Sequence, residues 1–167
     1  ASSEVVASTS DRFYSPLVKT IAREEGMQIT HVFNTHLHAD HVSGDQELRL
    51  ATGAEIYIHE SAPVEYKHRA LKAGDTFELG AAKIEVLHTP GHTPGHISVL
   101  DPVGGLLVAG DALNGADGGV IGANPQFTSD MALANESIRK LASLSFATVV
   151  FGHGEPAVDS ASQQVAE

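Results

Sequence analysis

The chain contains no cysteine, and its 10 Lys and Arg are outnumbered by 21 Asp and Glu, which gives a formal net charge of −11. The absence of cysteine excludes disulfides, thiolate metal ligands and thiol nucleophiles together. Because basic residues are few and form no cluster, the protein surface would repel a polyanion such as nucleic acid. We therefore expect a small-molecule substrate and no nucleic-acid partner.

The sequence also lacks any apolar run of the roughly 20 residues that a membrane-spanning helix requires. Residues 1–10 have neither the basic start nor the hydrophobic stretch of a signal peptide, although a removed signal peptide is also compatible with the sequence. These features predict a cytoplasmic protein without a membrane partner. With 167 residues, 42% of them hydrophobic, the chain predicts a single domain over residues 1–167.

The most distinctive feature is a cluster of three histidines and one aspartate within six positions: His36, His38, Asp40 and His41. The apolar core of residues 30–35 predicts a strand that leads into this cluster. His36 and His38 would then project to the same side and bind one metal ion. Asp40 and His41 follow on a turn, where they can reach a second ion. The spacing therefore indicates a site for two metals.

Three further polar residues each follow an apolar run and a glycine: His92, Asp111 and His153. Glycine allows the chain to turn sharply where a strand ends, so the next side chain can point into a shared pocket. We expect these three residues to complete the site.

Together these residues resemble the ligand pattern of the metallo-β-lactamase-fold hydrolases, His-x-His-x-Asp-His followed by separate His, Asp and His, over residues 29–156. The resemblance implies an α/β (α+β) fold, a four-layer αββα sandwich. It also implies the ligands: His36, His38 and His92 for the first metal, Asp40, His41 and His153 for the second, and Asp111 as the bridge. The family's usual first hairpin is not visible here, and a homo-oligomer that covers the free sheet edge is one expected consequence.

Residue patterns predict helices over residues 15–26 and 44–53, and a third helix capped by Thr128 or Ser129. Leu17, Ile21 and Ala22 are expected on the buried face of the first helix. Strands are predicted over residues 4–7, 55–59, 76–79, 83–88, 97–100, 106–109 and 147–151.

The other histidines have no matching ligand context. We expect surface or hydrogen-bonded roles for His31, His59, His68 and His88. His96 occupies a position that, by the resemblance, supports the orientation of a ligand and does not bind metal itself.

Two divalent ions acidify a shared water towards neutrality and polarise a substrate carbonyl, so the expected reaction is hydrolysis of an ester, lactone, thioester or related bond. Nitrogen and oxygen ligands favour zinc, but manganese, cobalt and ferrous iron accept the same donors. Asp40 is expected to orient the nucleophilic water and to carry a proton to the leaving group. The alternative for Asp40 is metal ligation alone.

Substrate selection is expected to lie in the glycine-rich segment 113–126, which has no evident regular structure. Asn114 and Phe127 flank it, where they either touch the substrate or cap and pack the loop. Glyoxalase-type thioesterases carry a basic glutathione-binding stretch beyond the last ligand, whereas this chain ends soon after His153 with acidic residues. A glutathione thioester is therefore a disfavoured substrate.

Two alternatives remain open. Residues 29–98 also resemble persulfide dioxygenases, in which a single ferrous ion would be bound by His36, His92 and Asp111. The Gly-Arg-Thr/Pro-Asp type of segment that follows the aspartate in those enzymes is absent here. The other alternative is a metal-binding domain without activity.

Overall fold

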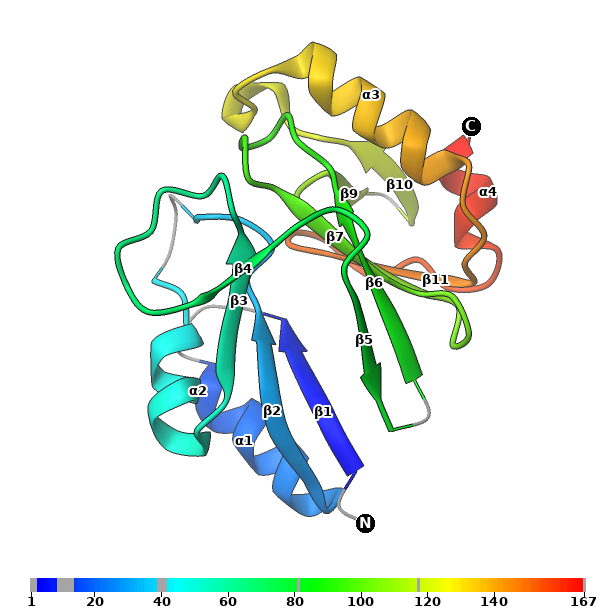
Figure 1. The fold of residues 1–167 in the computed structure, drawn as a ribbon. Helices are drawn as coiled ribbons and strands as arrows, with labels where there is room; N and C mark the ends of the chain where they lie inside the picture. The colour runs from blue at the N-terminus through cyan, green and yellow to red at the C-terminus, as the bar shows by residue number, and fades with distance from the viewer. Residues whose placement is uncertain (1–2, 9–13, 39–41, 81, 117, 167) are drawn as a thin grey trace.

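The computed structural model describes residues 3–8, 14–38, 42–80, 82–116 and 118–166. Two β-sheets pack face to face, with helices on the outer side of each (Figure 1). In order across the first sheet are β1 (Ser3–Ser8), β2 (Met27–Phe33), β3 (Glu55–His59) and β4 (Arg69–Leu71). In order across the second are β11 (Thr148–Phe151), β8 (Leu106–Gly110), β7 (Ile97–Asp101), β6 (Ala82–His88) and β5 (Thr76–Leu79).

The strands of the first sheet are parallel, and helices connect three of them. Strand β1 leads through α1 (Ser15–Glu24) to β2, and β2 leads through α2 (Asp45–Thr52) to β3. Both helices pack against β2. On the other side of the molecule lie α3 (Met131–Ala142) and the short C-terminal helix α4 (Ala161–Ala166), which pack against each other (Figure 1).

Three separate hydrophobic clusters fill the spaces between four layers. One lies between α1, α2 and the first sheet and includes Ala22, Val32 and Leu48. The second lies between the sheets, where Phe33 of β2 meets Val86 of β6. The third lies between the second sheet and α3, whose Leu141 is fully buried. Because strand side chains alternate between faces, each sheet contributes to two clusters. The predicted αββα sandwich is therefore confirmed.

The predicted buried face of α1 is partly wrong. Ala22 is buried, but Leu17 and Ile21 are 54% and 50% exposed. Apolar residues occur on two sides of this helix, and the side that packs on the sheet carries Ser15, Val18 and Ala22. The cap of α3 is also corrected: Asp130 accepts hydrogen bonds from the backbone N–H groups of the first turn, in place of Thr128 or Ser129.

The glycine-rich segment is more ordered than predicted. Strands β9 (Leu113–Ala116) and β10 (Gly119–Gly122) form an antiparallel hairpin, and the short 3₁₀ helix η2 (Pro125–Phe127) follows it. The expectation of an irregular loop from residue 113 is therefore wrong for most of its length. Strand β4 and helix α4 were also not predicted. Among the described residues, no helix is long and apolar enough to cross a membrane.

Candidate metal centre

The predicted ligands come together because the strands that carry them end at one edge of the sandwich. Strands β6, β8 and β11 run in the same direction, and they are followed by His92, Asp111 and His153 respectively. His36 follows β2 of the first sheet. The backbone N–H of Ile97 donates to the carbonyl of Thr35 at 2.8 Å, which joins the two sheets next to His36.

One carboxylate oxygen lies at the centre of the cluster. Asp111 Oδ2 is 3.5 Å from Nε2 of His153, 3.6 Å from Nε2 of His92 and 3.8 Å from Nε2 of His36. His36, His92 and Asp111 each offer a donor atom within 4.8 Å of the other two. The ring of His38 lies beside that of His36, with 4.1 Å between the centroids. Asp111 therefore faces ligands predicted for both metals.

The cluster is buried on one side and open on the other. His36 and Asp111 are 2% and 8% exposed, whereas the side chain of His153 is 60% exposed. The Nδ1 atom of His36 is hydrogen-bonded to Thr35 Oγ1 at 3.0 Å, so its Nε2 faces Asp111. A hydrogen bond to the distal ring nitrogen fixes the orientation of a metal-binding histidine.

Glycine is required beside the cluster for steric reasons. A Cβ atom at Gly152 would collide with the carboxylate of Asp111, and a Cβ at Gly91 would collide with the backbone of Ala134 in α3. Gly91 also has a φ of 132°, which L side chains rarely adopt. The glycine before each of these ligands thus permits close packing as well as a turn.

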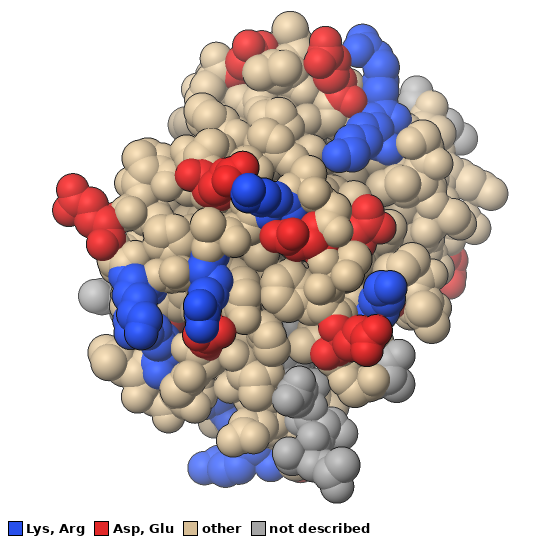
Figure 2. Space-filling view, viewed as in Figure 1, with Lys and Arg blue, Asp and Glu red and all other residues tan. Residues whose placement is uncertain are grey.

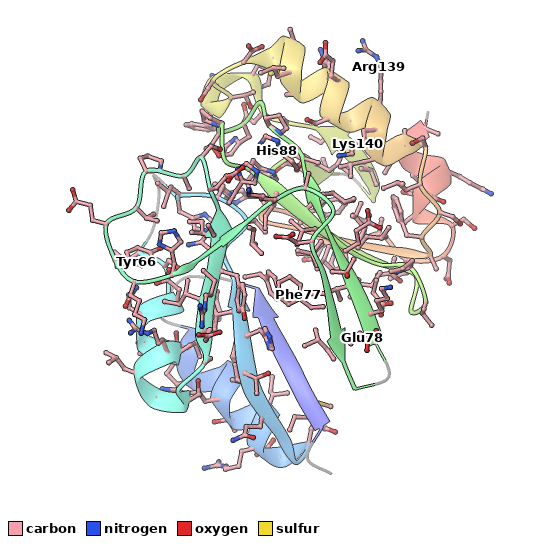
Figure 3. All side chains as sticks on the ribbon, viewed as in Figure 1. Tyr66, Phe77, Glu78, His88, Arg139 and Lys140 are labelled. Carbon is pink, nitrogen blue, oxygen red and sulfur yellow. The ribbon has the colours of Figure 1, made fainter. Side chains whose placement is uncertain are left out.

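Helix α3 fixes the backbone of the segment that presents His92. Ser129, at the turn before the helix, donates from its backbone N–H at 3.2 Å and from its Oγ at 2.9 Å to the carbonyl of His92. Ser137 Oγ donates to the carbonyl of Pro90 at 2.7 Å. Lys140 Nζ donates to the carbonyl of His88 at 3.2 Å, and these two residues lie together beneath α3 in Figure 3.

His96 does not line the cavity, but it contacts the backbone of Asp111. It is fully buried, and its Nε2 accepts a hydrogen bond from the Asp111 N–H at 3.0 Å. An accepting Nε2 leaves the ring proton on Nδ1, which lies 2.8 Å from Thr89 Oγ1. Thr89 in turn contacts Ser98 Oγ at 3.0 Å, and Ser98 donates to the carbonyl of Ala109. Burial lowers the pKa of His96 to about 3, so the ring is neutral at physiological pH.

The remaining histidines have other contacts, as expected. His31 stacks on Tyr57, with 5.2 Å between the ring centroids. His59 and His88 stack on each other at 3.9 Å, and His68 Nδ1 contacts the carbonyl of Tyr66 at 2.8 Å. The predicted ligands Asp40 and His41 lie outside the described residues.

A cavity of about 1080 Å³ opens at the cluster. Its floor includes His36, His92, Asp111 and His153, and its far side is formed by residues 121–129, which we call the outer wall. Asn114 and Phe127 both line the cavity, and Asn114 Nδ2 also bonds the carbonyl of Gly122 at 3.1 Å. Sequence reasoning missed Ile121, whose only signal was an isolated large apolar residue in a glycine-rich segment.

The donor set fits a divalent metal ion. Two donors on one tetrahedral zinc ion lie about 3.4 Å apart, which follows from metal–ligand distances of about 2.0–2.1 Å. The distances from Asp111 Oδ2 to three imidazole nitrogens are close to this value. Imidazole and carboxylate are ordinary ligands of zinc, iron and manganese, so the donors do not distinguish these metals.

Comparisons with known proteins agree with this geometry. A family model described as the metallo-beta-lactamase superfamily matches residues 7–153. A hydroxyacylglutathione hydrolase of Rhodospirillum rubrum is 36% identical over 139 residues, which are 81% of this chain and 52% of that protein. One from Rhizobium johnstonii is 37% identical over 142 residues, which are 83% of this chain and 53% of that protein. The chain thus spans about half the length of the curated relatives that it matches.

Solved structures give the same fold. ETHE1 from Myxococcus xanthus has a TM-score of 0.77 and 26% identity, with 91% of this chain and 66% of that chain covered. A metallo-beta-lactamase from Staphylococcus aureus has a TM-score of 0.73 and 29% identity, with 90% and 49% covered. The names of the curated relatives agree with the predicted enzyme class, and the superfamily implies divalent metal ions. The chain therefore belongs to the metallo-β-lactamase superfamily.

Proposed function

We propose that this chain is a metal-dependent hydrolase that cleaves a thioester or a related ester or lactone bond of a small molecule at a dinuclear, zinc-containing centre. The observation that carries the proposal is the position of Asp111, whose Oδ2 lies 3.5–3.8 Å from three imidazole nitrogens on separate segments. The names of the curated relatives favour a thioester among these substrates.

In this proposal the residues divide into two ligand sets. His36, His38 and His92 would hold the first ion, Asp40, His41 and His153 would hold the second, and Asp111 would be shared between them. When bound, the two ions supply a nucleophilic water that is acidic enough to react at neutral pH, and they polarise the substrate carbonyl. Asp40 would serve as the group that orients the water and passes a proton to the leaving group.

His96 and α3 keep this arrangement rigid. His96 holds the backbone at Asp111 through the N–H bond of 3.0 Å. Ser129 and Ser137 hold the backbone on both sides of Gly91. Small displacements of ligands are costly in catalysis, and a misplacement of about 1 Å lowers rates by roughly 100-fold.

A mononuclear iron persulfide dioxygenase is the second candidate, and two observations favour it. His36, His92 and Asp111 are the residues whose donor atoms lie within 4.8 Å of one another, and they are the set that such a centre requires. The fold is also similar to that of ETHE1. The presence of His153 beside Asp111 favours the hydrolase, because a mononuclear centre has no use for this residue.

The test is a substrate panel with protein loaded separately with zinc and with ferrous iron. Hydrolysis of thioesters, esters or lactones by the zinc form, lost in Asp111→Ala, supports the proposal. Oxygen uptake with a persulfide by the iron form alone would replace it with the dioxygenase. No turnover of any compound at full metal occupancy would identify a metal-binding domain without activity.

A further inference from the structure

We propose that the outer wall selects substrates whose acyl group is uncharged and apolar. This inference rests on the proposed hydrolase function and names its substrate class. In the reaction, the water oxygen bonds to the carbonyl carbon, the C–S bond breaks, and the thiol leaves with the proton. The proposal places the acyl group in the cavity between the metal centre and the outer wall, and the thiol part outside it.

Large apolar side chains on the outer wall are exposed to the cavity. Ile121 at the end of the β9–β10 hairpin is 53% exposed, and Phe127 in η2 is 70% exposed, and both line the cavity. Ala123 and Pro125 lie between them along the same lining. Exposed apolar residues gathered in one cavity mark a binding surface, because a ligand that covers them removes this area from water.

The polar side chains around these residues are used to hold the wall itself. Asn124 Oδ1 accepts from the backbone N–H of Gln126 at 3.0 Å, and Thr128 Oγ1 donates to the carbonyl of Asn124 at 2.7 Å. Asn114 Nδ2 donates to the carbonyl of Gly122, and Ser129 Oγ donates to that of His92. Each of these four side chains thus uses one polar group to fix the shape of the wall.

The charged residues that line the cavity also favour an uncharged acyl group. Among the described residues that line the cavity, the ionisable ones are the histidines and Asp111. The described lining includes no Lys or Arg. Figure 2 shows Lys and Arg in small groups, including one over the C-terminal half of α3. A substrate carboxylate would thus find no ion-pair partner on the outer wall, on a chain whose net charge is already −11.

The experiment measures kcat/KM of the zinc-loaded protein for acyl thioesters of N-acetylcysteamine, from acetyl to octanoyl, with succinyl as the charged analogue. We expect kcat/KM to rise by about tenfold or more between acetyl and hexanoyl, and succinyl to be poorer than butyryl. Phe127→Ala and Ile121→Ala should lower kcat/KM for hexanoyl by about tenfold more than they lower kcat/KM for acetyl, because the longer chain covers more of the wall. Val103→Ala is the matched control, because Val103 is an apolar residue that is 77% exposed and does not line the cavity, and this variant should keep the chain-length profile of the unchanged protein.

The outcomes separate this inference from the function on which it rests. Hydrolysis that is equal across the series, or fastest with succinyl, would overturn the apolar selection and leave the hydrolase in place. An unchanged chain-length profile in Phe127→Ala and Ile121→Ala would also overturn it. Failure of the hydrolase itself would appear as no turnover of the acetyl and hexanoyl compounds alike.

Discussion

The floor and the outer wall of the cavity differ in how tightly the fold constrains them. On the floor, His36 and Asp111 are almost completely buried, and Gly152 leaves no room for a methyl group. On the outer wall, Phe127 and Ile121 are more than half exposed and come from one short local segment. In our proposal, catalysis and substrate selection therefore depend on different residues: changes in the floor should affect all substrates, and changes in the wall should affect only some of them.

The largest effect is expected when the central carboxylate of the floor is removed. Asp111→Ala should lower hydrolysis of every substrate by at least about 1000-fold and reduce the bound metal, because the variant loses the ligand that both ions share. Activity and elemental analysis on the same sample check this. His68→Ala is the control, since His68 lies away from the cluster, and it should keep both. Substantial activity in Asp111→Ala would contradict the ligand assignment.

A smaller loss of activity, again for every substrate, is expected when a methyl group is added at Gly152 beside the carboxylate of Asp111. Gly152→Ala should lower kcat/KM by about 100-fold for short and long acyl groups alike, because the Cβ displaces Asp111. In Gly119→Ala the nearest neighbour of the new Cβ is the carbonyl oxygen of Ala116 at 3.7 Å, which is ordinary contact. A Gly152→Ala enzyme as active as Gly119→Ala would show that the floor is less rigid than described.

The next prediction concerns His96, which accepts a hydrogen bond from the backbone N–H of Asp111. His96→Leu removes the acceptor of the buried Asp111 N–H, so we expect a loss of about 1–3 kcal/mol in the free energy of unfolding. Metal affinity, measured by competition with a chelator, should fall by roughly 10–100-fold. His96→Gln keeps an acceptor and a donor and should recover part of this affinity. Equal affinities in the two variants would mean that His96 acts only by filling space.

The smallest effect concerns a histidine outside the cavity. Burial, and then the charge of the neighbouring His88, lowers the pKa of His59. Below the unfolded pKa of about 6.5 the unfolded chain therefore binds more protons at this residue, and stability decreases as the pH falls. In His59→Gln, denaturation curves between pH 7 and 5 should show a shallower decrease, by at most about 1.4 kcal/mol per pH unit. Parallel pH profiles would contradict the lowered pKa.

The sequence allowed the floor to be predicted because metal chemistry admits few residue types. His92, Asp111 and His153 each follow a strand and a glycine, and the structure brings them beside His36. The family resemblance supplied the αββα layers, and the four strands predicted between residues 76 and 109 agree with β5 to β8. The end of a strand and the metal-binding residue that follows it are encoded by a few neighbouring residues, so both can be predicted from the sequence.

The outer wall could not be predicted in the same way. The β9–β10 hairpin contains Gly115, Gly118, Gly119 and Gly122, which weaken any strand signal, and its pairing depends on the partner strand. Leu17 and Ile21 of α1 were misassigned for a related reason. Apolar residues line two sides of that helix, and the sheet decides which side is buried.

The dinuclear hydrolase proposal is tested most directly by the metal content of protein purified without added metal, measured by elemental analysis together with thioester turnover of the same sample. We expect about two zinc ions per chain and hydrolysis that is lost on chelation and restored by zinc. About one iron per chain, with oxygen uptake on a persulfide and no thioester hydrolysis, would contradict it.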